Sequence, residues 1–132
     1  MNDEVEAWMR YAGDNLQVAK LCQENGLFNP SLQNSQQAVE KALKALCLLS
    51  GLSLKRTHSI ESLRNDLTAK GVVALLDDEE CELLDSVYLP SKYPLGSVLP
   101  HFDPDAEIAS RCVRIAERVL EFAYRRVGNG GR

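Results

Sequence analysis

The stretch from Ser31 to Ser50, SLQNSQQAVEKALKALCLLS, constrains the fold of this 132-residue chain more than any other. Wound at about 100° per residue, it divides into one broad apolar face and one polar face. Its alanine, leucine, lysine, glutamate and glutamine residues favour a helix. Pro30 suits the start of a helix and Gly51 suits its end. The stretch therefore predicts a long amphipathic helix against which the rest of the chain packs.

The two faces of this helix differ in the neighbours they require. The apolar face carries Leu32, Ala38, Val39, Ala42, Leu43, Ala45, Leu46 and Leu49. The polar face carries Gln33, Asn34, Gln37, Glu40, Lys41 and Lys44. A helix of this kind buries its apolar face and leaves the polar one in water. Glu40 and Lys44 are one turn apart, so we expect them to form a local ion pair.

Three residues of this helix break the pattern, since Ser35 and Gln36 fall on the apolar face and Leu48 on the polar one. A buried amide without partners costs about 1–3 kcal/mol. Gln36 is therefore expected either to bond a neighbouring helix or to line an internal polar cleft. Its candidate partners are Asp14, Asn15 and the backbone of a later Tyr-Pro segment. Leu48 is either an ordinary exposed leucine or part of a contact between subunits, and the second interpretation predicts a homodimer.

The remaining chain predicts four more helices from their caps and stops. These run from Asn2 or Asp3 to about Asn25, from Thr57 or Ser59 to Gly71, from the cap Asp77 to Tyr88, and from the Asp103-Pro104 pair to about residue 127. Their expected core residues are Val5, Trp8, Ala12, Leu16, Ala19, Cys22, Ile60, Leu63, Leu67, Leu83, Leu84, Val87, Ile108, Cys112, Ile115, Val119 and Phe122. The short link before the central helix makes the first two helices antiparallel neighbours.

Residues 89–102, LPSKYPLGSVLPHF, carry three prolines and no periodicity, so we expect an ordered loop there. No strand pattern is present. The predicted fold class is all-α, an up-and-down bundle of four long helices with one short extra helix. The domain is expected to span residues 1–127, and residues 128–132 to form a disordered C-terminal tail.

Composition excludes several classes of protein. The formal net charge of −4 argues against a protein whose whole surface grips nucleic acid, although a local basic patch remains open. No apolar run approaches the roughly 20 residues needed to cross a bilayer. The N-terminal sequence MNDEVEAW lacks the basic and then apolar layout of a secretory signal. A cytoplasmic protein without membrane contact is expected.

The four cysteines are far apart in sequence, at Cys22, Cys47, Cys81 and Cys112. This spacing fits neither a zinc site nor a disulfide framework. They are most simply small buried residues in a reducing compartment. The chain has two histidines and therefore offers few ligands for a metal ion, so we expect no metal and no cofactor.

Four sequence segments together resemble one known family. They read Trp8…Ala12-x-Asp14-x-Leu16-x-x-Ala19, Ser35-Gln36-Gln37-Ala38-x-Glu40-Lys41-Ala42-x-Lys44-Ala45, Thr57-His58-Ser59-Ile60…Leu63, and Tyr88-x-Pro90-x-Lys92-Tyr93-Pro94. In this order they resemble the HEPN family, named for higher eukaryotes and prokaryotes nucleotide-binding. The resemblance covers nearly the whole chain, and its most specific part is the Gln-Gln-Ala-x-Glu-Lys-Ala-x-Lys-Ala run followed by Thr-His.

The resemblance implies a helical bundle that commonly dimerises. It also implies a small bacterial or archaeal protein encoded beside a minimal nucleotidyltransferase, the two acting as a toxin–antitoxin pair. Many members of that family are metal-independent RNases with an arginine, a polar residue, a few further positions and a histidine. This chain departs from that motif, because neither His58 nor His101 has an arginine four to six intervening positions before it. The expected function is a nucleotide- or partner-binding module, and the alternative is an RNase with its histidine at another position.

Cleavage of RNA without a metal needs a group that titrates near neutral pH and a cation for the developing phosphorane charge. The candidate catalytic residues are accordingly His101, Lys92, Tyr93 and His58. The candidate ligand-binding residues, which could contact a nucleotide or RNA, are Gln36, Gln37, Glu40, Lys41, Lys44, Lys92 and Tyr93. In the structural alternative, Lys92 is solvated, Tyr93 packs, and the two histidines bond backbone at helix starts.

A stripe of arginines on the last predicted helix, at Arg111, Arg114, Arg118 and Arg125, could hold phosphates. Three glutamates lie three or four residues from them, at Glu107, Glu117 and Glu121. A solvated face of local ion pairs is therefore the favoured interpretation of the stripe.

Overall fold

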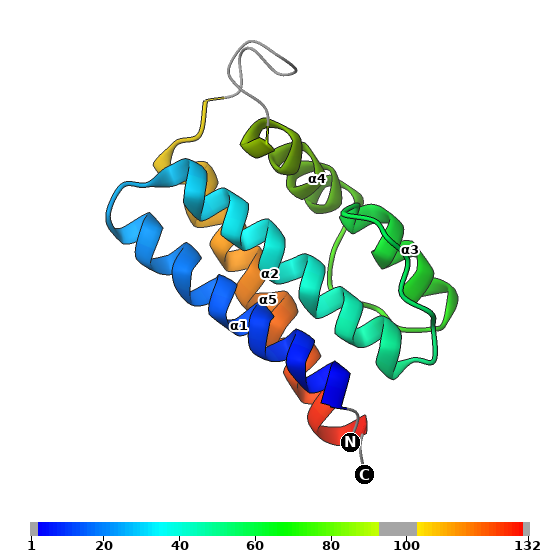
Figure 1. Cartoon of the computed structure of the whole chain (residues 1–132). Coiled ribbons are helices and arrows are strands. Elements are labelled where there is room, and N and C mark those ends of the chain that lie inside the picture. Colours follow the sequence, from blue (N-terminus) through cyan, green and yellow to red (C-terminus); the bar gives the residue numbers. More distant parts are fainter. Residues whose placement is uncertain (1–2, 93–102, 131–132) are drawn as a thin grey trace.

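The computed structural model describes residues 3–92 and 103–130 of the chain. Within these residues there are five helices and no strand, which confirms the all-α class (Figure 1). The helices are α1 (Asp3–Glu24), α2 (Phe28–Leu49), α3 (Ile60–Ala69), α4 (Asp78–Lys92) and α5 (Ala106–Gly130). None of the described helices is long and apolar enough to cross a membrane.

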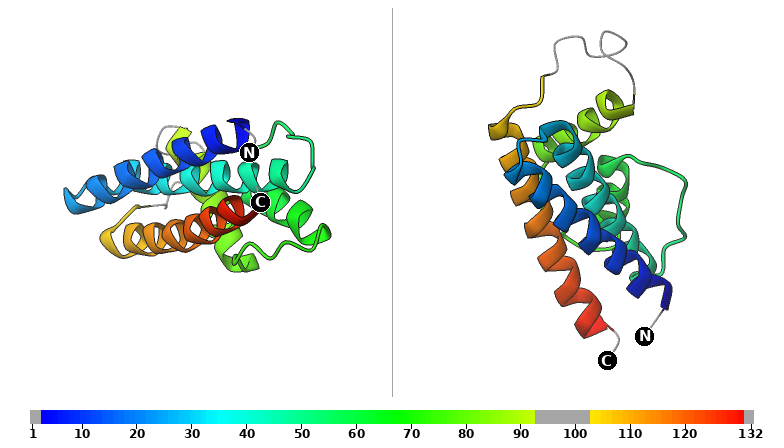
Figure 2. Two further views of the ribbon diagram at one scale, coloured as in Figure 1. Left: turned by 90° about the horizontal axis from the view of Figure 1, so that it is seen from below. Right: turned by 60° about the vertical axis from the view of Figure 1, so that its left-hand side comes forward.

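Helix α2 lies at the centre of the bundle and packs against each of the other four helices. Helices α1 and α5 lie along one side of it, and α3 and α4 lie along the other (Figures 1 and 2). The start of α1 and the end of α5 lie at the same end of the bundle. A helix with neighbours on both sides has little surface left for water. Because of this position, several polar residues of α2 are buried rather than exposed to solvent.

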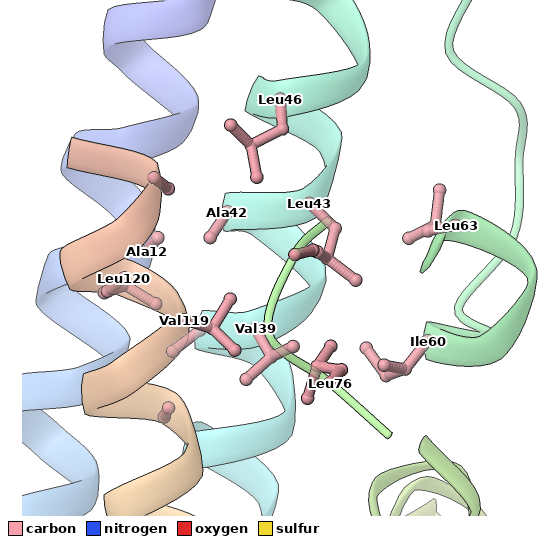
Figure 3. Close-up of a cluster of buried hydrophobic side chains, with 14 of the residues drawn as sticks. Ala12, Val39, Ala42, Leu43, Leu46, Ile60, Leu63, Leu76, Val119 and Leu120 are labelled. Atoms are coloured by element: carbon pink, nitrogen blue, oxygen red, sulfur yellow. The ribbon is translucent and has the colours of Figure 1, made fainter. Parts of the chain in front are cut away.

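The hydrophobic core forms where α2 meets its neighbours. Figure 3 shows Ala12 of α1 and Val119 and Leu120 of α5 close to one side of α2, with Ile60 and Leu63 of α3 on the other. Eleven of the seventeen core residues predicted on the other four helices are buried, and the remaining six, Cys22 among them, are half-buried. Trp8, Leu16, Leu83, Ile108 and Phe122 are half-buried and pack against the core edge, as does Leu48.

Two predicted helix boundaries were wrong. Helix α4 continues through Pro90 to Lys92, so residues 89–92 belong to it rather than to the loop. Proline removes one backbone donor, but so near the helix end this costs a single intrahelical bond. The cap of α5 is Asp105 rather than Asp103, because the Asp105 carboxylate accepts a hydrogen bond from the backbone N–H of Ile108 at 2.8 Å.

The remaining boundary predictions are borne out in part. Helix α2 begins at Phe28, so Pro30 lies in its first turn rather than just before it. Helix α5 continues to Gly130, beyond residue 127. The division of the chain into a domain and a C-terminal tail stays a prediction.

Candidate functional site

The centre of the candidate site is Glu40, a buried carboxylate in the middle of α2. The polar face of this helix was expected to lie in water, and for Glu40 that was wrong, since only 3% of the residue is exposed. Lys44 is buried as well. The reason is that other parts of the chain cover both residues, since His58, just before α3, lies against Glu40 and Trp8 of α1 lies against Lys44.

Three hydrogen-bond donors surround the Glu40 carboxylate. Lys44 Nζ lies 3.0 Å from Oε2 and forms the expected ion pair one turn along the helix. Gln36 Nε2 lies 3.4 Å from Oε1, one turn in the other direction. The third donor is His58 Nδ1, at 3.1 Å from Oε1 and 3.3 Å from Oε2. A buried carboxylate is stable only with such partners, and here it has a full set.

His58 is the member of this group that reaches the surface. Its side chain is 56% exposed, and its ring stacks on Tyr88 of α4 with centroids 4.7 Å apart and planes 17° apart. Since a carboxylate can only accept, the contact with Glu40 assigns the proton to Nδ1. The Nε2 atom is then left as the group that can take or give a proton. We call Gln36, Glu40, Lys44, His58 and Tyr88 the His58 cluster.

Gln36 points inward as predicted and is fully buried, but its hydrogen bonds do not go to Asp14 or Asn15, and the Tyr-Pro segment lies outside the described residues. Its amide donates to the His58 carbonyl at 3.2 Å, and its oxygen accepts from Gln37 Nε2 at 2.9 Å. Asn15, a predicted partner, instead accepts from Lys41 Nζ at 2.7 Å. Gln36 therefore tethers the segment before α3 to the central helix.

The N-terminus of α3 fixes the same segment from the other side. The Ser59 hydroxyl caps α3 by accepting from the backbone N–H of Ser62 at 3.1 Å. Asp85 of α4 accepts from the backbone N–H of Ile60 at 2.6 Å and from that of Glu61 at 3.2 Å. A carboxylate at a helix N-terminus satisfies free donors and complements the helix dipole. The sequence offers no signal for Asp85, because the residue that it caps lies 25 positions away.

The structure brings together only some of the candidate residues. Gln36, Gln37, Glu40, Lys44 and His58 lie in or beside the His58 cluster, as the contacts above show. Lys41 is bound to α1 instead. Tyr93, His101 and the side chain of Lys92 lie outside the described part of the chain.

The aromatic residue Trp8 of α1 extends the cluster, since Lys44 Nζ lies 5.5 Å from the centre of its ring. A cation at this distance from an indole face is attracted by the ring quadrupole. Contacts therefore run from α1 through α2 to His58 and α4. Lys44 is committed to Glu40 and Trp8, so the exposed imidazole is the group best placed to meet a ligand.

The arginine stripe of α5 does form ion pairs, but mostly not local ones. Arg118 Nη2 lies 2.6 Å from Glu80, and Arg111 lies 3.5 Å from Glu79, both on α4. Only the Arg125–Glu121 pair, at 2.6 Å, follows the predicted spacing along the helix. Arg111 and Arg118 therefore join α5 to α4, whereas Arg114 donates to Ser110 within α5, so all four arginines already have partners in the protein.

Three of the four cysteines are buried thiols that stay protonated at neutral pH. Cys47, Cys81 and Cys112 are free and buried, and burial raises the pKa of each thiol to about 11. Among residues 3–92 and 103–130, no group of three histidine, cysteine or acidic side chains is placed to hold a metal ion.

Comparisons with known proteins point to one family. The family model of the HEPN domain matches residues 5–127. A protein of Methanocaldococcus jannaschii named "Putative toxin MJ1304" is 29% identical over 126 residues, which cover 86% of this chain and 82% of that protein.

Two solved structures have the same fold. TT1696 from Thermus thermophilus superimposes with a TM-score of 0.76 at 27% identity, covering 95% of this chain and 98% of that one. A HEPN domain protein from Thermotoga maritima, TM0613, gives 0.69 at 25% identity, covering 93% and 98%.

Proposed function

Because this chain belongs to the HEPN family, we propose that it is a nucleotide- or RNA-binding module whose binding site is the His58 cluster. The observation that carries this proposal is the buried Glu40 carboxylate. Burying a charge is costly even when the charge is paired, and hydrophobic residues of similar volume often stabilise a core as well. In this arrangement, the Glu40 carboxylate fixes the orientation of the exposed His58 ring and holds its proton on Nδ1.

The name of the M. jannaschii relative supports a toxin role for this chain. We therefore propose that it is one half of a toxin–antitoxin-type pair, with a minimal nucleotidyltransferase as its partner. The family resemblance further suggests a homodimer in the cytoplasm. Sedimentation across micromolar concentrations tests the dimer, and a monomeric profile throughout would contradict it.

Binding is tested by fluorescence anisotropy with a labelled single-stranded RNA and with a labelled adenine nucleotide, both in EDTA. We expect His58→Ala to weaken binding at least tenfold and Glu40→Gln, which frees the ring, to weaken it less. The matched control is Arg125→Ala, an exposed residue of α5 paired within its own helix. An affinity of His58→Ala within twofold of the unmodified protein would contradict the proposal.

Salt dependence gives a second measure of the same site. A site formed by the His58 cluster alone would contact about one or two phosphates of a single strand. For a single strand, this number of contacts corresponds to a slope of log K against log salt between about −0.7 and −1.4. A much steeper slope would indicate binding by a broad basic surface rather than by the His58 cluster.

A second candidate function, metal-independent RNA cleavage, is favoured by the Glu40–His58 contact. A carboxylate on Nδ1 orients the imidazole and fixes its tautomer, which is how many enzymes position a histidine for proton transfer. In this alternative, His58 Nε2 would transfer the proton.

The two functions separate in one experiment, with RNA incubated in EDTA and analysed on a gel. Cleavage that is lost in His58→Ala would establish the enzyme at the cluster. Cleavage lost in His101→Ala instead would assign the chemistry to the segment that precedes α5. Intact RNA at high protein concentration, together with saturable binding, would leave the binding module as the function.

A further inference from the structure

The turn between α3 and α4 exposes two apolar side chains, and hydrogen bonds from arginine side chains hold its backbone in place. Val73 is 68% exposed and Leu75 is 44% exposed. Together with Leu76, Asp77, Glu80 and Arg118, they line a surface groove of about 430 Å³. This groove lies away from the His58 cluster, and none of the cluster residues lines it.

Leu75 adopts a strained conformation, with a φ of 61°. It is the one non-glycine residue with positive φ in the described part of the chain. A leucine in this region is a true outlier, since its Cβ crowds the following carbonyl. Strain of this kind persists only where the surroundings impose it, and it collects at functional sites.

Two arginines impose the conformation of the turn. Arg118 of α5 donates to the Leu75 carbonyl through Nε at 3.2 Å and Nη2 at 3.0 Å. Arg64 of α3 donates to the Leu76 carbonyl at 3.1 Å and to the Asp78 carboxylate at 2.6 Å. The turn is therefore clamped from both sides, and its apolar side chains are presented in a fixed position.

The start of α4, which directly follows the groove residues Leu76 and Asp77, carries exposed carboxylates. The side chains of Asp78 and Glu79 are 88% and 80% exposed, and Glu82 follows them on α4 and is also exposed. Arg64, the partner of Asp78, is largely buried, and Arg118 points to the turn carbonyl. Arg111 and Arg118 are similarly exposed, at 44% and 42%, and pair with Glu79 and Glu80. The surface offered to a partner is thus an apolar groove beside outward-facing carboxylates.

We propose that this turn is a docking site for a second protein that binds through a basic amphipathic segment. An apolar side chain of the segment would fill the groove, and its lysines or arginines would meet the carboxylates of α4. Apolar burial would supply the affinity, and the charges would select the partner and orient it. This proposal does not depend on the function of the His58 cluster.

The test uses a synthetic amphipathic helix of leucine and lysine as the probe, and the same peptide with glutamate in place of lysine as its charge-reversed control. Leu75→Asn is the decisive variant, since asparagine tolerates positive φ while losing the apolar side chain. We expect the lysine peptide to bind and to shift the methyl resonances of Val73 and Leu75. Leu75→Asn should weaken this binding at least tenfold without lowering the melting temperature by more than about 4 °C.

Two further variants localise the result. Val18→Ser, which removes an exposed apolar side chain from α1, and His58→Ala should both bind the lysine peptide as the unmodified protein does. The proposal is overturned if the lysine peptide does not bind, if Leu75→Asn binds it within twofold, or if the glutamate peptide binds equally well.

Discussion

At the scale of single residues, the most informative groups are Glu40 and Lys44. Both are buried, although the helical periodicity of α2 places them on its polar face. Periodicity correctly turned Gln36 inward and paired Glu40 with Lys44. It could not show that both members of the pair are buried, because periodicity gives angles around one helix and says nothing of how many neighbours that helix has. The environment of a residue on α2 is set by all four of the helices that pack around it.

The first prediction concerns the Glu40–Lys44 pair, whose side chains are both almost completely buried. Lys44→Met removes one charge and leaves the other partly uncompensated, so we expect the free energy of unfolding to fall by about 3 kcal/mol. Glu40→Gln strands the ammonium in the same way. The double variant should lose clearly less than the sum of the two, by at least about 1 kcal/mol, in urea unfolding at neutral pH.

The control for this cycle is Lys55→Met, which breaks an exposed pair with Asp66. Exposed pairs are screened by solvent, and this change should alter stability by less than about 1 kcal/mol. Additive losses in the Glu40 and Lys44 variants would mean that the two charges act independently.

Gln36 gives the second prediction, because its amide joins the His58 carbonyl to α2. Gln36→Leu keeps the length of the side chain but leaves that carbonyl and Gln37 without their partner. We expect a loss of about 1–2 kcal/mol in urea unfolding and weaker ligand binding, since His58 is no longer anchored. Gln33→Leu, on the same helix but outside the cluster, is the matched control. If Gln36→Leu and Gln33→Leu were equally stable, the hydrogen bond from Gln36 to the His58 carbonyl would contribute no net free energy to folding.

At the scale of elements, the sequence predicted which helices exist better than it predicted where they end. Helix existence follows from periodicity and caps, which are local. The end of α4 depends on whether one lost hydrogen bond at Pro90 outweighs the rest of the helix. The start of α3 depends on Asp85, a contact between distant parts of the chain. Neither is visible in a single stretch of sequence.

The third prediction tests the Asp85 cap of α3. Asp85→Ala removes an acceptor from the backbone N–H groups of Ile60 and Glu61, so we expect a loss of about 1–2 kcal/mol. Hydrogen exchange at these two amides should become faster while exchange in α1 stays the same. Glu82→Ala, an exposed change on the same helix, should have little effect. Unchanged exchange at Ile60 would show that Ser59 suffices as the cap.

At the scale of the whole molecule, one central helix surrounded by four others produces both the core and the site. The apolar residues of α2 hold the bundle together, and its buried Glu40 contacts the exposed His58. The candidate residues on α2 and His58 could be predicted from sequence because a family motif spans them. Their geometry could not, since it arises where α2, α4 and the segment before α3 meet.

The last prediction concerns the pH range in which the fold survives. Cys47, Cys81 and Cys112 have pKa values of about 11 in the folded protein because they are buried, whereas an unfolded thiol titrates near 8.5. Between these values the unfolded chain has lost protons that the folded chain keeps, so stability falls as pH rises. Each thiol contributes about 1.4 kcal/mol per pH unit over this interval. Three thiols together are comparable to a total stability of about 5–15 kcal/mol, so we expect unfolding between about pH 9 and 11.

Urea unfolding in the presence of a reductant, repeated at increasing pH, measures this slope. Replacing any one of the three buried cysteines with alanine should lower the slope by about 1.4 kcal/mol per pH unit, whatever it does to stability at pH 7. Cys22→Ala, which removes a half-buried thiol from α1, is the control for the loss of a cysteine as such. The slope separates thiol ionisation from simple loss of packing, because a cavity lowers stability by the same amount at every pH. A slope that stays the same in all three variants would assign the alkaline limit to groups other than the thiols.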